Sequence, residues 1–137
     1  SPFPVPLAGE AKAFFASVGG DAGSAVFILK TRFMRPRPPK TDATLQPCIT
    51  LPNGKAYPSG HATTAHLYAL ILAELVPARA PEFLARGEQS ALYRVIGGVH
   101  HPSDIEAGKR LAQSLLAELK QKPAFNAELA RLRKQLP

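Results

Sequence analysis

Cysteine and tryptophan are nearly missing: the 137 residues contain one cysteine, Cys48, and no tryptophan. A single thiol excludes an internal disulfide and any metal site that needs two thiolates. The other aromatic residues, 7 Phe and 3 Tyr, do not form the aromatic-rich basic groove on which nucleic-acid bases stack. We therefore expect no nucleic-acid partner.

Long apolar runs are missing as well. The longest, residues 67–76, is interrupted by Glu74 and is much too short to cross a bilayer. No secretory signal is visible, and the chain begins at Ser1 rather than Met, which is typical of a processed or trimmed product. The sequence predicts no transmembrane segment, and it leaves secretion open.

No segment shows the strict alternation of apolar and polar residues that a half-buried strand needs, whereas helical periodicity is plentiful. We expect one all-α domain, residues 1–137, built as a compact bundle of about five to six helices. Gly19 and Gly20 should close the first helix, and Pro36 should end the second. The expected helices cover residues 10–18, 24–34, 59–76, 81–96, 102–120 and 123–134.

The segment 36–57 has many prolines, an Asn53-Gly54 turn signal and no periodicity. A structureless connection of about 20 residues is uncommon in a compact domain unless it is functional or disordered. Because this segment joins two of the motifs described below, we expect it to form a long loop beside a functional site.

The charge is unbalanced: 17 Lys and Arg face 10 Asp and Glu, a net charge of +7. Such an excess suits an anionic partner such as a phosphate ester, a nucleic acid or an acidic lipid surface. The basic run 131–134 is expected to be a solvated helix face. The sequence has neither a carboxylate cluster suited to Mg²⁺ nor a Cys/His set suited to Zn²⁺, so we expect no metal and no cofactor.

The first of three short motifs pairs two cations. Lys30 lies in the last turns of an expected helix, and Arg37 lies just past its end on a proline-stiffened segment. Both can point at one anion, Arg with a planar fork that matches phosphate oxygens and Lys with a compact charge. Taken alone, the pair is explained more simply as cations that complement the dipole at a helix C-terminus.

The second motif is Ser59-Gly60-His61, directly before an apolar helix. A helix N-terminus presents unpaired N–H groups that bind phosphate, and Gly60 lets the backbone approach a ligand without a Cβ in the way. His61 could reach the same anion and donate a proton to it. Ser59 as an ordinary N-cap is the structural alternative.

The third motif places Arg94 six residues before His100 and Asp104 four residues after it. A glycine pair ends one helix and Pro102 starts the next, so Asp104 can reach back to one imidazole nitrogen. That contact would fix the tautomer and leave the other nitrogen free to attack, with Arg94 as a third cation. The alternative is an acid favoured by the helix dipole beside an ordinary turn histidine.

Together and in this order, Lys-x6-Arg-Pro, Pro-Ser-Gly-His and Arg-x5-His-x3-Asp resemble the signature of the type 2 phosphatidic acid phosphatase superfamily. That group includes bacterial class A non-specific acid phosphatases, membrane lipid phosphatases and vanadium haloperoxidases. The match spans residues 30–104, more than half of the chain. Arg37 fits the first motif better than Arg35, because Arg35 has Ile28 rather than a cation seven residues upstream.

The resemblance implies metal-independent hydrolysis of phosphate monoesters through a phosphohistidine, closest in character to the soluble class A enzymes. It implies that His100 is the nucleophile, that Asp104 orients it and that His61 protonates the leaving alkoxide. The phosphate-binding residues that it implies are Lys30, Arg37, Ser59, Gly60 and Arg94. The implied partner is a small phosphorylated substrate, and the implied location is periplasmic or secreted.

The sequence departs from the family at Tyr93, where Ser is usual, and it is shorter than typical members. Completion of the core by a second copy, as a homo-oligomer, is therefore one expectation. The alternatives that stay open are a phosphatase of lipid or isoprenoid phosphates or diphosphates, a vanadate-dependent haloperoxidase, and a non-enzymatic module that binds anions or nucleic acid. His66 and His101 are expected to be packing or surface residues.

Overall fold

The computed structural model describes residues 3–5 and 8–136, and within these residues the ordered elements are all helical. The expected all-α bundle is therefore confirmed. In chain order the elements are α1 (Ala8–Phe33), α2 (Pro38–Thr41), α3 (Gly60–Leu75), the 3₁₀ turn η2 (Pro77–Arg79), α4 (Ala80–Ile96), α5 (Pro102–Leu119) and α6 (Pro123–Lys134).

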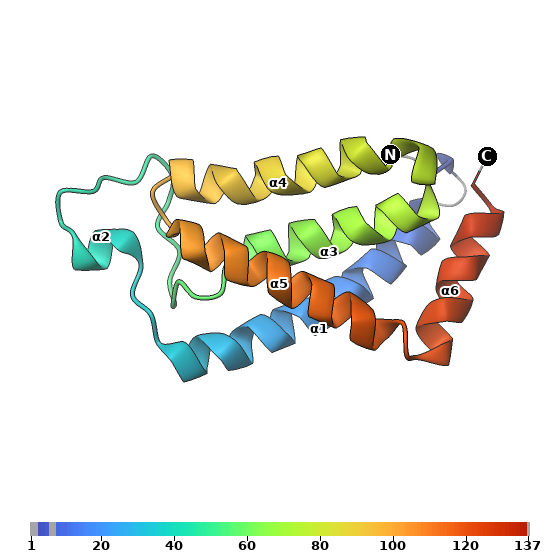
Figure 1. The fold of residues 1–137 in the computed structure, drawn as a ribbon, viewed down its shortest axis with the longest axis horizontal. Helices are drawn as coiled ribbons and strands as arrows, with labels where there is room; N and C mark the ends of the chain where they lie inside the picture. Colours follow the sequence, from blue (N-terminus) through green and yellow to red (C-terminus); the bar gives the residue numbers. More distant parts are fainter. Residues whose placement is uncertain (1–2, 6–7, 137) are drawn as a thin grey trace.

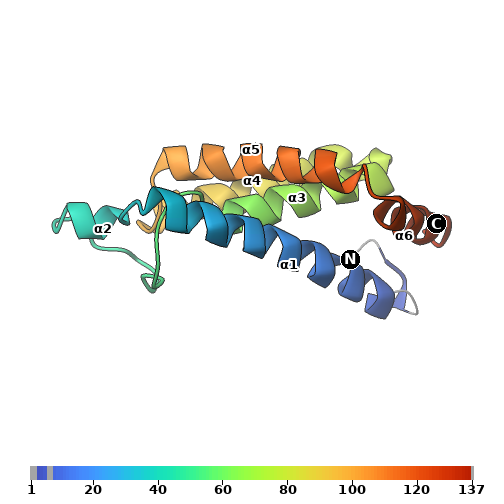
Figure 2. The same ribbon diagram turned by 90° about the horizontal axis from the view of Figure 1, so that it is seen from below.

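Helix α3 is the centre of the bundle and packs against α1, α4 and α5. Figure 2 shows α1 on one side of α3, with α4 and α5 on the other. Helix α6 closes the end of the bundle near both chain termini, while α2 and its flanking loops project at the opposite end (Figure 1). This opposite end is where the three sequence motifs lie.

One apolar cluster fills the half of the bundle next to α6. Leu67 and Ile71 of α3 are fully buried there, and α1, α5 and α6 contribute the rest of the lining. Full burial of a Leu or Ile side chain stabilises the fold by about 1.5–3 kcal/mol. The half that carries the motifs has a smaller cluster, formed by Ala62, Ala91 and Ile105, so polar contacts have a larger share in holding it together.

Helix α1 runs without a break through Gly19 and Gly20, so the expected division into two helices is wrong. Each helical glycine costs about 1 kcal/mol relative to alanine. Buried side chains nevertheless continue at four-residue spacing across the pair, from Val18 to Ala22. Gly19 also makes room for Tyr68, whose hydroxyl donates a 2.5 Å hydrogen bond to the carbonyl of Phe15. Tertiary packing thus overrides the local signal.

The later helices follow the expected pattern closely. Helices α3, α4, α5 and α6 begin and end within one or two residues of the expected ranges, because Pro77, Pro102 and Pro123 mark their boundaries. The connection 36–57 is largely a loop, as expected, except that α2 adds one helical turn after Arg37.

By length and composition, the stretch Ala8–Thr41 contains a window apolar enough to cross a membrane, which the expectation of no transmembrane segment did not foresee. A core helix or a signal sequence near an N-terminus passes the same test. Only 22% of this window is buried, so α1 exposes apolar side chains, among them Phe27 and Ile28. The helix is therefore less covered than a typical core helix.

Gly108 is a close point of contact between α5 and α3. A Cβ at this position would lie 2.8 Å from the carbonyl oxygen of Ser59 and 2.9 Å from the Cβ of Ala62, and neither can move aside easily. Gly108→Ala should therefore lower the free energy of unfolding by about 1–3 kcal/mol, measured by urea denaturation. Gly20→Ala is the matched control. It meets no atom within 4 Å and should stabilise the fold by about 0.4–1 kcal/mol. Equal effects of the two changes would contradict this packing.

Candidate functional site

The three motifs converge at the end of the bundle away from α6. The end of α1 and the segment after it supply the first motif, the start of α3 the second, and the end of α4 with the start of α5 the third. The residues brought to this end are Lys30, Arg37, Ser59, Gly60, His61, Arg94, His100 and Asp104.

His100 and Asp104 form a buried pair. The Nδ1 of His100 lies 3.2 Å from Oδ2 of Asp104, and the two residues are 3% and 0% exposed. Burial alone would raise the pKa of Asp104, but hydrogen bonds from His100 and His101 and the charge of Arg35 prevail and hold it at about 2. Burial lowers the pKa of His100, although Asp104 opposes this. At neutral pH the carboxylate therefore accepts the Nδ1 proton of a neutral imidazole, and Nε2 carries a lone pair.

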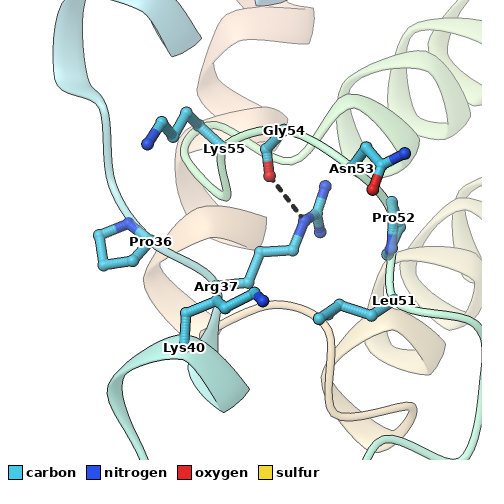
Figure 3. Close-up of a pocket in the computed structure, with 8 residues that line it drawn as sticks. All are labelled: Pro36, Arg37, Lys40, Leu51, Pro52, Asn53, Gly54 and Lys55. Carbon is cyan, nitrogen blue, oxygen red and sulfur yellow. Dashed lines mark hydrogen bonds between the residues drawn. The ribbon is translucent and has the colours of Figure 1, made fainter.

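Arg37 is fixed beside that lone pair. Its Nη1 donates to Nε2 of His100 at 3.1 Å and to the carbonyl of Val99 at 2.9 Å. Its Nε donates to the carbonyl of Gly54 at 3.0 Å, as Figure 3 shows. Only 6% of the residue is exposed. A rigid guanidinium at this position can hold an anion directly in front of the imidazole nitrogen.

Lys30 adds a second cation without a carboxylate partner. Its ammonium group donates to the carbonyls of Lys55 and Ala56. Partial burial, followed by the charge of Arg37, lowers the pKa of Lys30 to about 8. The group is therefore still largely protonated at neutral pH, and its charge is not neutralised by an ion pair among the described residues.

Arg94 and His61 are the remaining charged or titratable side chains that the three motifs bring to this end of the bundle. The Nε of Arg94 is buried and has no hydrogen-bond partner in the described part of the chain. Partial burial and then the charges of Arg94, His100, Arg37 and Lys30 lower the pKa of His61, in that order. His61 therefore lies within the electrostatic reach of all four. The buried Nε of Arg94 can donate to an anion oxygen placed among these groups.

The start of α3 differs from expectation in one respect. The N–H of Ser59, which the resemblance assigned to phosphate, donates instead to the carbonyl of Asp104 at 3.0 Å. The Ser59 hydroxyl accepts from Ala62 N at 3.3 Å and is the N-cap of α3. Gly60 occupies the first helical position, whose N–H has no partner inside the helix. The N–H of Ser59 is therefore used within the fold, and a role of Ser59 and Gly60 in binding phosphate stays a prediction.

Two residues in the site were missed by the sequence analysis. Arg35 donates from Nη1 to Oδ1 of Asp104 at 2.8 Å and to the hydroxyl of Ser103 at 2.7 Å. His101, expected to be a packing or surface residue, places its backbone N–H 2.8 Å and its Nδ1 3.1 Å from Oδ2 of Asp104. No local pattern marks Arg35, because its contact joins residues 69 positions apart.

Two pockets flank these groups in the described structure. One, of about 410 Å³, lies beside Arg37. In Figure 3 Arg37 and Lys40 extend toward it from the same strip of chain, and Leu51, Pro52 and Asn53 face them from the other side. The other, of about 470 Å³, begins at His61 and runs between α1, α3 and α4. Apart from His61 its lining is uncharged: Gly23, Val26, Gly60, Thr64, Ala65, Tyr68 and Ser90. A bound phosphate ester could extend from the cations toward either pocket.

The fold and the candidate site define an all-helical protein in which several cationic side chains surround a buried histidine–aspartate pair. The sequence profile of the PAP2 superfamily, the type 2 phosphatidic acid phosphatases, matches residues 11–124. The chain belongs to this superfamily, as its three motifs indicated.

Named relatives come from several bacteria. A non-specific acid phosphatase of Salmonella typhimurium is 41% identical over 87 residues, which cover 64% of this chain and 35% of that protein. A non-specific acid phosphatase of Providencia stuartii is 34% identical over 115 residues, covering 80% and 46%. A decaprenylphosphoryl-5-phosphoribose phosphatase of Mycolicibacterium smegmatis is 32% identical over 87 residues, covering 64% and 46%. The chain spans less than half the length of these relatives.

The electrostatics of His61 can be tested without any assay of activity. Its imidazole should titrate below the ordinary value of 6.5, because burial and nearby cations disfavour the charged form. Replacing Arg94 by Gln removes a positive charge and should raise the pKa of His61, as followed by NMR of its ring protons. Arg110→Gln, an exposed cation on α5, serves as the control. If both variants shifted the titration equally, Arg94 would not share the site with His61.

Proposed function

We propose that this protein is a metal-independent phosphatase that hydrolyses phosphate monoesters through a phosphohistidine intermediate. The observation that carries the proposal is the arrangement around His100. Asp104 accepts its Nδ1 proton, while Arg37 lies 3.1 Å from the opposite nitrogen. The same nitrogen would be both the attacking atom and the atom next to the bound phosphate.

The proposed reaction has two displacements. In the first, Nε2 of His100 forms a bond to phosphorus while the ester P–O bond breaks, and His61 in its imidazolium form gives a proton to the departing alkoxide and becomes neutral. In the second, His61 takes a proton from water, the water oxygen attacks phosphorus, and the N–P bond breaks to release inorganic phosphate. Asp104 keeps the imidazole in one tautomer and stabilises the positive charge that develops on it.

Charge stabilisation supplies most of the rate in this proposal. Uncatalysed hydrolysis of phosphate monoesters is among the slowest reactions known, so the barrier must fall by a large amount. Fixed donors aimed at the equatorial oxygens act without reorganisation during the reaction. Lys30, Arg37 and Arg94 are such donors, and each charge-assisted hydrogen bond contributes roughly 1.5–3 kcal/mol. Because these side chains provide the positive charge, no metal ion is required.

Loss of the nucleophile gives a direct test. His100→Ala should abolish hydrolysis of p-nitrophenyl phosphate but retain binding of inorganic phosphate, measured by calorimetry, because the cations remain.

Wild-type protein quenched during turnover of ³²P-labelled substrate should carry acid-labile label on His100, and chelator should not reduce its activity. Label on His101 or on a serine would overturn the assignment.

The role of His61 predicts a dependence on the leaving group. His61→Ala should lower kcat/KM, which reports the first displacement, by about 10²–10⁴-fold for an alkyl phosphate, because a poor leaving group needs a proton. The loss should be much smaller for p-nitrophenyl phosphate, whose phenolate leaves unprotonated. Equal losses for both substrates, measured by steady-state kinetics, would exclude His61 as the general acid.

A second candidate is a phosphatase of lipid or isoprenoid phosphates. The uncharged pocket that begins at His61 favours it, since an apolar leaving group could lie between α1 and α4. One relative is named for a decaprenyl-linked substrate. A long-chain phosphate that outcompetes glycerol phosphate by a large margin in kcat/KM would favour this candidate over a small soluble substrate.

The proposal extends to the cellular location of the protein and to its assembly with a second copy. We base a periplasmic or secreted location on the resemblance to the class A enzymes, and the apolar stretch Ala8–Thr41, which carries Lys30 and Arg37 of the site, is compatible with a retained membrane anchor. Exposed apolar side chains on α1 and α4, among them Phe27, Ile28, Leu92 and Ile96, suit a homo-oligomer.

A further inference from the structure

The geometry points to Arg35 as a positioning residue for the reaction: it holds the Asp104 carboxylate so that one oxygen faces Nδ1 of His100. This inference rests on the proposed function, because it concerns the same nucleophile. Nη1 of Arg35 lies 2.8 Å from Oδ1 of Asp104, and the second oxygen, Oδ2, lies 3.2 Å from Nδ1 of His100. The two oxygens therefore have separate partners, and the carboxylate cannot rotate without breaking both contacts.

Arg35 also joins three segments of the site. Its side chain donates to the Ser103 hydroxyl at 2.7 Å, which fixes it against the start of α5. Its backbone carbonyl accepts from the N–H of Ala56 at 2.9 Å, in the strip of chain whose carbonyls hold Lys30. It thereby links the segment that carries Arg37 to the segment that carries the nucleophile. No contact of Arg35 with Arg37, Arg94 or His61 is present in the described structure, so it acts through Asp104.

The charge of Arg35 also acts on Asp104, in addition to the hydrogen bonds from His100 and His101. A carboxylate at 0% exposure needs a nearby cation to stay ionised. If Arg35 supplies it, His100 can stay neutral and keep its Nε2 lone pair. Without Arg35, Asp104 would favour an imidazolium at His100, whose Nε2 is protonated and cannot attack.

Several other groups act on the same pair. His101 contacts Asp104 from the start of α5, and Arg37 and Lys30 act on His100 from the first motif. From α3, His61 is in electrostatic contact with His100, and Arg94 of α4 acts on His61 and Arg37. These groups surround His100, whereas Arg35 is the non-histidine cation that directly contacts Asp104 in the described residues.

Three variants separate charge from hydrogen bonding. Arg35→Gln removes the charge, Arg35→Lys keeps it, and Arg32→Gln removes an equal charge from an exposed position one turn earlier. Arg35→Gln should lower kcat for p-nitrophenyl phosphate by about 10–100-fold and should change KM little. A loss of this size follows when the groups that orient metal-bound histidines are removed. The acid limb of its kcat/KM profile should move to higher pH, because the pKa of His100 rises. Arg35→Lys should restore the limb, and Arg32→Gln should leave both quantities unchanged.

The outcomes distinguish this inference from the proposed function. An active wild type whose Arg35→Gln variant keeps kcat and pH profile would overturn the positioning role and leave the phosphatase proposal intact. A wild type without phosphatase activity would overturn both. If Arg35→Gln fails to fold by circular dichroism, Arg35→Met decides, because it removes the same charge: a folded Arg35→Met variant with the kcat and the acid limb of Arg32→Gln would contradict the inference.

Discussion

The Asp104 carboxylate is the group on which the candidate site depends. It is fully buried and ionised, and a buried charge of this kind costs several kcal/mol unless it is paired and hydrogen-bonded. Its partners come from two segments: Arg35 follows α1, and His100 and His101 precede α5. Its own backbone carbonyl accepts the N–H of Ser59, which fixes the start of α3. The end of the bundle with the smaller apolar cluster is thus organised around one polar residue.

Charge is distributed differently at the two ends of the molecule. Toward α6, Lys120 pairs with Glu74, and Arg131 pairs with Glu10 and Glu128. At the site, Lys30, Arg37 and Arg94 have no such partners among the described residues, and the one buried acid is already paired with Arg35. The excess of +7 is therefore partly concentrated where an anion would bind, and its local arrangement is more informative than its total.

The features that could be predicted from the sequence are those that neighbouring residues determine, above all the helix boundaries. Proline interrupts a helix or begins one, so Pro77, Pro102 and Pro123 allowed the ends of α3 to α6 to be predicted closely. The four-residue spacing of His100 and Asp104 also indicated that their side chains lie within reach of each other. Sequence reasoning failed where tertiary contacts decided. Gly19 lies inside α1 because Tyr68 packs over it, the Ser59 N–H is used by a carbonyl 45 residues away, and Arg35 meets Asp104 only after the bundle has formed.

The buried, unpartnered Nε of Arg94 has a consequence for throughput. This N–H lies among the other cations of the site, where a phosphate oxygen can accept from it. In the proposed reaction, the same oxygens occur on the ester and on the released inorganic phosphate, and these donors would not distinguish between the two. A preference for the ester over inorganic phosphate would then have to come from contacts with the leaving group of the ester. A site of this construction would slow as free phosphate accumulates, so its output would follow the phosphate concentration of its surroundings.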